Sequence, residues 1–363
     1  MEDDLNGFDW KYKNLFDSCV IVYENYNEGK KSYLFESKDM KNTVLVIKYK
    51  INTNNYLRLS KEVYFLACCK NNKYFAEIID VFITKDQNYL FIIIRAEGTD
   101  LKSIIDYENF DYNTAIPNFS RFAIFQIVCG LKILHSNGLS HNGIEPGNII
   151  VSDNGKIKIC DMGSTDKIST IKYGGTTSYS SPQCLLGKKR TKEDDMWSVG
   201  IVFLELLKKR SGIFNLIIDP EIRRDDRNKL ILKYILENFY DINLYENHIE
   251  NNKYNLIIQK ISNDEYNSFE AKFKSNLLAD INNEDKELIE NLLQIDPSKR
   301  KTAEEVLNLK MFNNLNCKFE DSSFYYLEKE YNYYFNNQTV NLNIFNNYIQ
   351  GMKSKFIGQE IFK

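Results

Sequence analysis

Two short segments between positions 140 and 163 carry the side chains best suited to chemistry. The loop Ser140-His141-Asn142-Gly143-Ile144-Glu145-Pro146-Gly147-Asn148 combines a histidine, a carboxylate and two amides. After twelve intervening residues, Asp161-Met162-Gly163 follows the apolar run KIKIC. A carboxylate followed by glycine at the end of a strand can ligate a metal ion or simply form a turn. Each segment alone could be an ordinary connector, so neither decides the function.

The elements that must position these segments change in character along the chain. From Asp17 to Phe91, strand-like runs are separated by turn-prone residues, and one helix is predicted over Tyr56 to Lys70. After Gly98, long helices are predicted, with short strands between them. This order predicts an α+β fold with a β-rich lobe, a helical lobe and a cleft between them. The predicted strands are CVIVY, SYLF, TVLVIKYK, YLFIII, NIIV and KIKIC, and the long helices are Phe119 to Asn137 and Asp194 to Lys209.

Composition limits the class of protein more than its partner. The 363 residues include 47 basic and 50 acidic side chains, so no overall charge favours nucleic acid or an anionic membrane. The seven cysteines show no CxxC spacing, which favours buried free thiols. The polar start and the absence of a long apolar run predict a location inside the cell, in the cytoplasm or nucleus.

Taken together and in order, the two segments resemble the catalytic loop and the metal-binding motif of eukaryotic protein kinases. The resemblance extends over Leu15 to Phe312 and is strongest to the cyclin-dependent kinase group, through Asp100-Leu101-Lys102 and LKILHSNGLSH. Further matching motifs are Leu45-Val46-Ile47-Lys48, Glu62, the hinge Phe91 to Glu97, Asp194 to Gly200 and Asp296 to Arg300.

The resemblance implies a bilobal protein-kinase-like fold with four parts. Residues 1–14 would be an N-terminal extension, 15–94 the N-lobe, 95–312 the C-lobe and 313–363 a C-terminal extension. Within that last part, a packed helix is predicted over Phe324 to Phe335.

The resemblance also assigns binding roles. Lys48 and Glu62 would form the ion pair that clamps the ATP phosphates, and Asn148 and Asp161 would bind Mg²⁺. ATP and Mg²⁺ are therefore the implied cofactors, and a protein substrate or partner is implied, without nucleic acid or membrane. The remaining nucleotide contacts would come from Ile94, Glu97 and Ile150.

Several family residues are replaced. Gly143 stands at the position of the catalytic aspartate, and Glu145 at that of the lysine that contacts the transferring phosphate. Asn142 replaces the arginine that grips a phosphorylated activation segment, and Gly29 alone remains of the phosphate loop. Glycine cannot accept a proton, and a general base contributes about 10² to 10⁴ in rate.

These replacements favour a pseudokinase that acts as a scaffold or allosteric regulator, with or without bound ATP. One alternative is a divergent serine/threonine kinase that transfers the ATP γ-phosphate to protein hydroxyls, with Glu145 as a displaced base. Another is a nucleotide-sensing switch that binds ATP without hydrolysing it.

Overall fold

The computed structural model describes residues 19–27, 30–37, 43–95, 98–107, 118–152, 154–170, 175–216, 221–244, 253–313, 315, 324, 331–332, 335 and 342–354. Glu97, Gly29 and the predicted extension 1–14 lie outside the described residues. The chain forms two compact units. Unit 1 contains Met1–Thr99, Ile150–Ser164 and Asp321–Lys363, and unit 2 contains Asp100–Ile149 and Thr165–Glu320.

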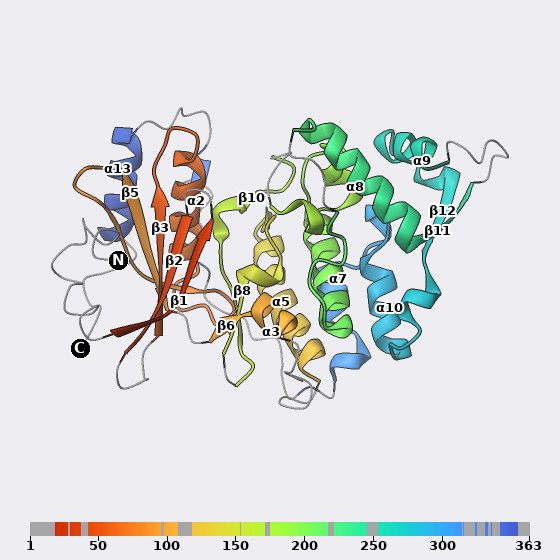
Figure 1. The fold of residues 1–363 in the computed structure, drawn as a ribbon, viewed down its shortest axis with the longest axis horizontal. Coiled ribbons are helices and arrows are strands. Elements are labelled where there is room, and N and C mark those ends of the chain that lie inside the picture. The colour runs from red at the N-terminus through yellow and green to blue at the C-terminus, as the bar shows by residue number, and fades with distance from the viewer. Residues whose placement is uncertain are drawn as a thin grey trace. The chain divides into compact units, whose positions relative to one another are not determined.

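A five-stranded antiparallel sheet forms the centre of unit 1 (Figure 1). The four strand-like runs predicted before position 95 all lie in it, so this part of the prediction is confirmed. Their β-branched and aromatic residues suit a pleated, half-buried surface. The strand order is β1-β2-β3-β5-β4, with β1 (Cys19–Asn27), β2 (Lys30–Ser37), β3 (Thr43–Lys50), β4 (Glu77–Ile83) and β5 (Tyr89–Arg95).

Helix α2 (Tyr56–Cys68) confirms the helix predicted from the spacing of its apolar residues. It is buried almost all round: only Leu57 and Arg58 are not among its buried residues. A helix that is apolar or buried on several sides must be covered from more than one direction. The strand β4 and the C-terminal helix α13 (Leu342–Met352) both contact α2 and provide this cover.

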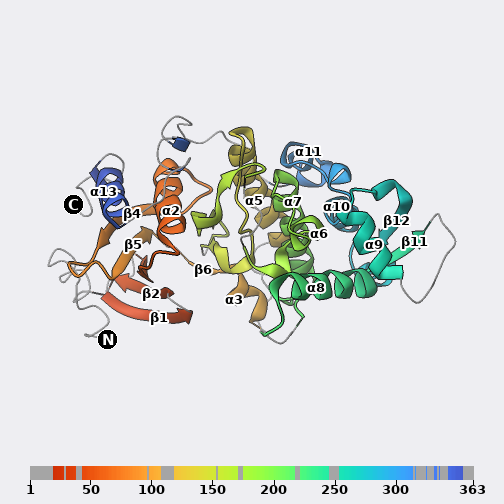
Figure 2. The ribbon, with the colours of Figure 1, turned by 90° about the horizontal axis from the view of Figure 1, so that it is seen from above.

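Helix α13 is part of the core of unit 1. In Figures 1 and 2, α13 lies beside the sheet, and it contacts both α2 and β4. Phe345 is fully buried and stacks on Tyr56 with ring centroids 5.2 Å apart. Just after α13, Lys353 forms an ion pair of 2.9 Å with Asp80, whose carboxylate is completely buried. The segment treated as an extension in the sequence therefore stabilises the β-rich unit.

Part of the predicted helix Phe324 to Phe335 is also seen. Tyr331, Asn332 and Phe335 are helical, whereas Phe324, the predicted first residue, is not; the residues between these positions lie outside the described ranges. The rings of Tyr331 and Phe335 lie 6.3 and 5.6 Å from the ring of Tyr64 on α2. This part of the chain adds to the same covered face of α2.

The segment Ile150–Ser164 places Asp161 in unit 1. Strand β9 (Ile157–Ile159) follows β8 (Ile149–Val151), and the backbone of Ile159 bonds to that of Tyr74 and Ala76. The short turn η2 (Met162–Ser164) then packs on α2. Asp161, between β9 and η2, consequently lies beside α2.

Unit 2 is mainly helical, around the packed pair α5 (Phe119–Ser136) and α7 (Lys192–Lys208). Both were predicted, and α7 begins at a capping box formed by Thr191 and Asp194. The β-rich and helical units together confirm the α+β kinase-like fold class. The other helices are α3 (Leu101–Asp106), α6 (Pro182–Leu185), α8 (Arg224–Phe239), α9 (Lys253–Ser262), α10 (Asn283–Leu292) and α11 (Ala303–Leu307).

Short strands complete the elements. Strand β7 (Leu139–Ser140) pairs with β10 (Asp166–Lys167), and β11 (Tyr240–Leu244) pairs with β12 (Phe269–Phe273). Strand β6 spans Thr99–Asp100. Within the ranges given above, no helix is long and apolar enough to cross a membrane. Five of the cysteines in these ranges are free and buried, as predicted; they are Cys68, Cys69, Cys129, Cys160 and Cys184.

Gly200 allows α7 and α10 to approach closely. A methyl group at this position would lie 2.9 Å from Cβ of Leu292 and 2.8 Å from a methyl carbon of Leu293. We expect Gly200→Ala to lower the free energy of unfolding by about 1–3 kcal/mol, because overpacking forces such contacts apart. Urea denaturation measures the change. Gly147→Ala is the matched control, since no atom lies within 4 Å of the added methyl; equal losses in both variants would contradict the packing argument.

Candidate functional site

Asp195 holds the shape of the loop that resembles a catalytic loop. Its carboxylate accepts hydrogen bonds from the backbone N–H groups of His141 and Asn142, both at 2.8 Å, and contacts Nε2 of His135 at 3.0 Å. Burial by itself would raise the pKa of Asp195, but the contacts with His135 and the loop outweigh it and lower the pKa. The loop is thus anchored to α7 by an ionised, fully hydrogen-bonded carboxylate.

The backbone does not require glycine at position 143. Its N–H donates to Nδ1 of His141 at 3.1 Å, and its carbonyl accepts from the Asn148 amide at 2.9 Å. Gly143 has no left-handed φ, and an added Cβ would lie at an ordinary contact distance of 3.5 Å from the His141 ring. An aspartate could therefore occupy this position, and the shape of the loop does not depend on glycine there.

The rest of the loop ends in the turn η1 (Pro146–Asn148). Glu145 immediately precedes that turn in extended backbone conformation. Asn148 uses its amide nitrogen to bond the loop carbonyl of Gly143, which leaves its side-chain oxygen as the atom able to ligate a cation.

Lys48 and Glu62 are not brought together, contrary to the ion pair expected from the sequence. The Lys48 ammonium lies over the ring of Tyr89, 4.2 Å from its centroid, and 5.7 Å from that of Phe91. The neighbouring Tyr49 instead reaches Glu62, and its hydroxyl donates to Oε1 at 2.8 Å. Successive strand residues point to opposite faces, so Lys48 must lie on the face of β3 opposite α2.

The surroundings of Lys48 agree with that direction. Val44 and Val46, which share its face of β3, belong to a buried apolar cluster with Phe91 and Ile93. Val46, which belongs to the motif that ends at Lys48, is thus part of this core cluster.

Glu62 is a fully buried carboxylate. Only Oε1 has a hydrogen-bond partner among the described groups, namely Tyr49. Burial, reinforced by the negative charge of Asp161, raises the pKa of Glu62 to about 7, although Lys30 and Arg58 oppose the shift. The charge on this glutamate therefore depends on pH near neutrality.

Asp161 is held by two cations of unit 1. Arg58 on α2 donates from one terminal nitrogen to both carboxylate oxygens, at 3.0 and 3.1 Å, and Lys30 of β2 lies 3.3 Å from Oδ2. Burial would raise the pKa of Asp161, but these two cations outweigh it and lower the pKa to about 2. Asp161 is therefore ionised near neutral pH.

Two of the three residues expected to complete the nucleotide contacts are described by the structure. Ile94 on β5 and Ile150 on β8 are buried, with 1% and 6% of their surface exposed. Glu97 lies outside the described residues. Ile94 and Ile150 belong to the core of unit 1 in this arrangement.

Sequence reasoning missed Arg58, Lys30 and Tyr49. A signal existed for Arg58, because it lies four residues before Glu62 on a predicted helix and so shares its face. No comparable signal existed for Lys30, which is 131 positions from Asp161.

A second anchor lies in unit 2 and ends the motif Asp296 to Arg300. The buried Arg300 donates to Oε1 of Gln183 at 2.6 Å. Its guanidinium also lies 5.0 Å from the centre of the Trp197 ring. These contacts are structural and involve no group suited to catalysis.

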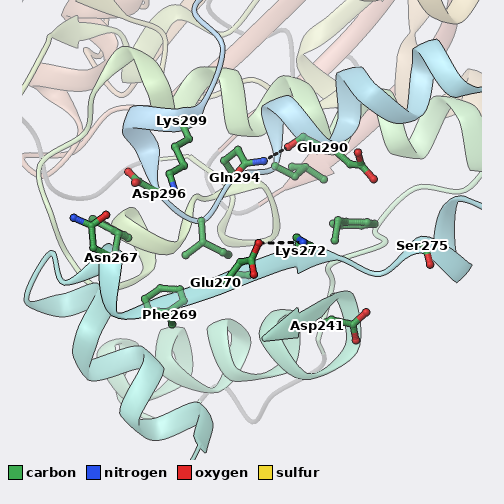
Figure 3. A pocket seen from close by; sticks show the side chains of 15 residues that line it. Asp241, Asn267, Phe269, Glu270, Lys272, Ser275, Glu290, Gln294, Asp296 and Lys299 are labelled. Atoms are coloured by element: carbon green, nitrogen blue, oxygen red, sulfur yellow. Dashed lines mark hydrogen bonds and ion pairs between the residues drawn. The ribbon is translucent and has the colours of Figure 1, made fainter. Parts of the chain in front are cut away.

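A cavity of about 620 Å³ lies in unit 2 between β12 and α10 (Figure 3). None of the predicted site residues lines it. Four carboxylates, Asp241, Glu270, Glu290 and Asp296, lie along its wall together with two lysines, Lys272 and Lys299, and Lys272 pairs with Glu270. The lining thus carries more negative than positive charge, which disfavours a phosphate group.

Residues 28–312 match the family described as "Protein kinase domain". The chain belongs to the protein kinase family. This kinase-family chain is similar to serine/threonine-protein kinase SSN3 of Scheffersomyces stipitis, with 28% identity over 67% of the chain and 59% of the relative. It is also similar to the probable cyclin-dependent kinase 8 of Dictyostelium discoideum, with 27% identity over 68% and 66%.

A mitogen-activated protein kinase, mpkC of Aspergillus oryzae, is 26% identical over 63% of the chain and 62% of the relative. The kinase-family chain therefore covers less than two thirds of the length of each of these relatives. These relatives bear out the resemblance to the cyclin-dependent kinase group and its neighbours.

Proposed function

We propose that this member of the kinase family is a pseudokinase that acts as a scaffold or allosteric regulator of a protein partner. The observation that carries the proposal is Gly143. The loop around it keeps its anchors, and the position has room for a side chain. The one residue that orients the attacking hydroxyl and takes its proton in kinases is missing from an otherwise well-formed loop.

The groups that would handle phosphate support the same proposal. The Lys48 ammonium lies against aromatic rings, while Glu62 bonds to Tyr49. Active kinases need the pair formed by these two positions in place. Glu145 puts a negative charge where the family has a positive one, which would oppose transfer of an anionic phosphoryl group.

Phosphotransfer assays with radiolabelled ATP, in Mg²⁺ and in Mn²⁺, test the proposal directly. We expect no incorporation above background from the full chain, with or without a general substrate protein. Incorporation that disappears in the Asp161→Ala variant would contradict the proposal, because that loss would show an engaged active site.

Restoring an aspartate at position 143 tests whether its absence alone accounts for the expected lack of activity. Gly143→Asp is expected to fold normally, because the added Cβ makes only ordinary contacts. It should nevertheless remain inactive, although a general base alone is worth about 10² to 10⁴ in rate. Activity in Gly143→Asp would mean that Lys48, Glu62 and Asp161 can adopt the active arrangement after all.

A further inference from the structure

The cluster around Asp161 has the wrong neighbours for a divalent cation. Both carboxylate oxygens accept hydrogen bonds from Arg58, and Oδ2 also pairs with Lys30. Mg²⁺ prefers several oxygen ligands at about 2.0–2.1 Å in octahedral geometry. A dication approaching these oxygens would meet two positive charges within about 3 Å of its ligand.

Arg58 and Lys30 have further N–H donors with which they could bind an anion. A guanidinium has five N–H donors and an ammonium three. In the described structure, Arg58 uses one terminal nitrogen on Asp161, and Lys30 makes one contact with it. Their side chains are 45% and 27% exposed, so the remaining donors are accessible from solvent.

The two side chains are also well oriented. Both cations lie over the ring of Tyr49, with Lys30 at 5.5 Å and Arg58 at 5.9 Å from its centroid. Tyr49 is itself fixed by its hydrogen bond to Glu62. Arginine presents a planar fork of donors that matches phosphate oxygens, and lysine adds a point charge. Asp161 and Tyr49 thus hold a pair of cations in place before any ligand arrives.

We propose that Lys30 and Arg58 form a metal-independent site for the phosphate groups of a nucleoside triphosphate, with Asp161 as the anchor of the two cations and not as a ligand of Mg²⁺. This inference rests on the proposed function, because it describes the nucleotide-binding mode of a chain that does not transfer phosphate. In it, two side chains supply the positive charge that Mg²⁺ supplies in an active kinase.

Isothermal titration calorimetry of the full chain with ATP, in EDTA and in excess Mg²⁺, tests the proposal. We expect ATP to bind in EDTA at least as tightly as in Mg²⁺, because the metal neutralises the charge that Lys30 and Arg58 recognise. Inorganic triphosphate should bind with the same dependence on Arg58. Binding that requires Mg²⁺, or no binding of ATP in EDTA, would overturn the proposal.

Substitutions sharpen the result. Arg58→Gln and Lys30→Gln should each weaken ATP binding about tenfold, as expected for losing one charge-assisted hydrogen bond. The control Lys85→Gln changes an exposed lysine in a turn of unit 1 and should have no effect. Equal affinities for Arg58→Gln and Lys85→Gln would overturn the proposal.

Asp161→Asn gives the clearest contrast. A neutral amide oxygen binds Mg²⁺ more weakly than a carboxylate, so metal-dependent ATP binding would weaken in this variant if Asp161 held Mg²⁺. In the proposed site the same change removes a competing negative charge, and ATP should bind equally or severalfold more tightly. Metal-dependent binding without phosphotransfer would reject this inference alone, whereas metal-dependent binding with phosphotransfer would reject the proposed function as well.

Discussion

Phe345→Ala is expected to lower the free energy of unfolding by about 3–5 kcal/mol, the usual cost of truncating a buried phenylalanine. The side chain has no exposed surface and stacks on Tyr56 of α2. Its removal would leave a cavity between α13 and α2, where Ile349 and Met352 are also buried. Urea denaturation followed by circular dichroism and tryptophan fluorescence measures the change.

Asn347→Ala is the matched control, because it lies on the same helix and its side chain is exposed. Exposed substitutions of this kind usually change stability by less than about 0.5 kcal/mol. Similar small effects of Phe345→Ala and Asn347→Ala would mean that α13 does not pack on α2 in solution.

Glu62→Gln is expected to stabilise the protein above pH 7 by up to about 3 kcal/mol and to have little effect near pH 4. The pKa of Glu62 is raised from 4.5 to about 7, so between these values the folded state binds more protons than the unfolded state. Stability of the parent protein must therefore fall as pH rises through this window, and level off above it. Glutamine keeps an oxygen to accept the bond from Tyr49 and carries no charge.

Denaturation of both proteins at several pH values measures the difference. Glu287→Gln, which changes an exposed glutamate, is the control and should change the free energy of unfolding by less than about 0.5 kcal/mol. The ion pair expected from the sequence makes the opposite prediction. If Glu62 paired with Lys48 in solution, glutamine would leave a buried ammonium without its partner and destabilise the protein above pH 5.

The fold could be predicted because its signals are local and ordered. The apolar runs that became β3 and β5, and the spacing of Leu59, Val63 and Leu66 that became α2, need no knowledge of the rest of the chain. The direction of Lys48 could not be predicted in the same way. A strand residue changes face when its register shifts by one position, and register depends on pairing with other strands.

Local sequence patterns also could not predict which segments of the chain come together in unit 1. Phe345, Tyr348, Ile349 and Met352 have helical spacing in the sequence, which could have indicated α13. Nothing in that spacing says that the helix packs on α2, nearly 300 positions earlier. The pairing of Lys353 with the buried Asp80 could not be predicted either, because the sequence around each of these charged residues contains no distinctive pattern.

The discontinuous course of unit 1 also sets an order of events during synthesis on the ribosome. Its first segment ends at Thr99, and its last begins at Asp321, more than 200 residues later. At typical translation rates this delay is on the order of 10–40 s. During that time α2 exists without α13, and the carboxylate of Asp80 without Lys353. The helical unit can complete its core first, so the nascent β-rich unit is the part that would need protection from aggregation until the chain is released.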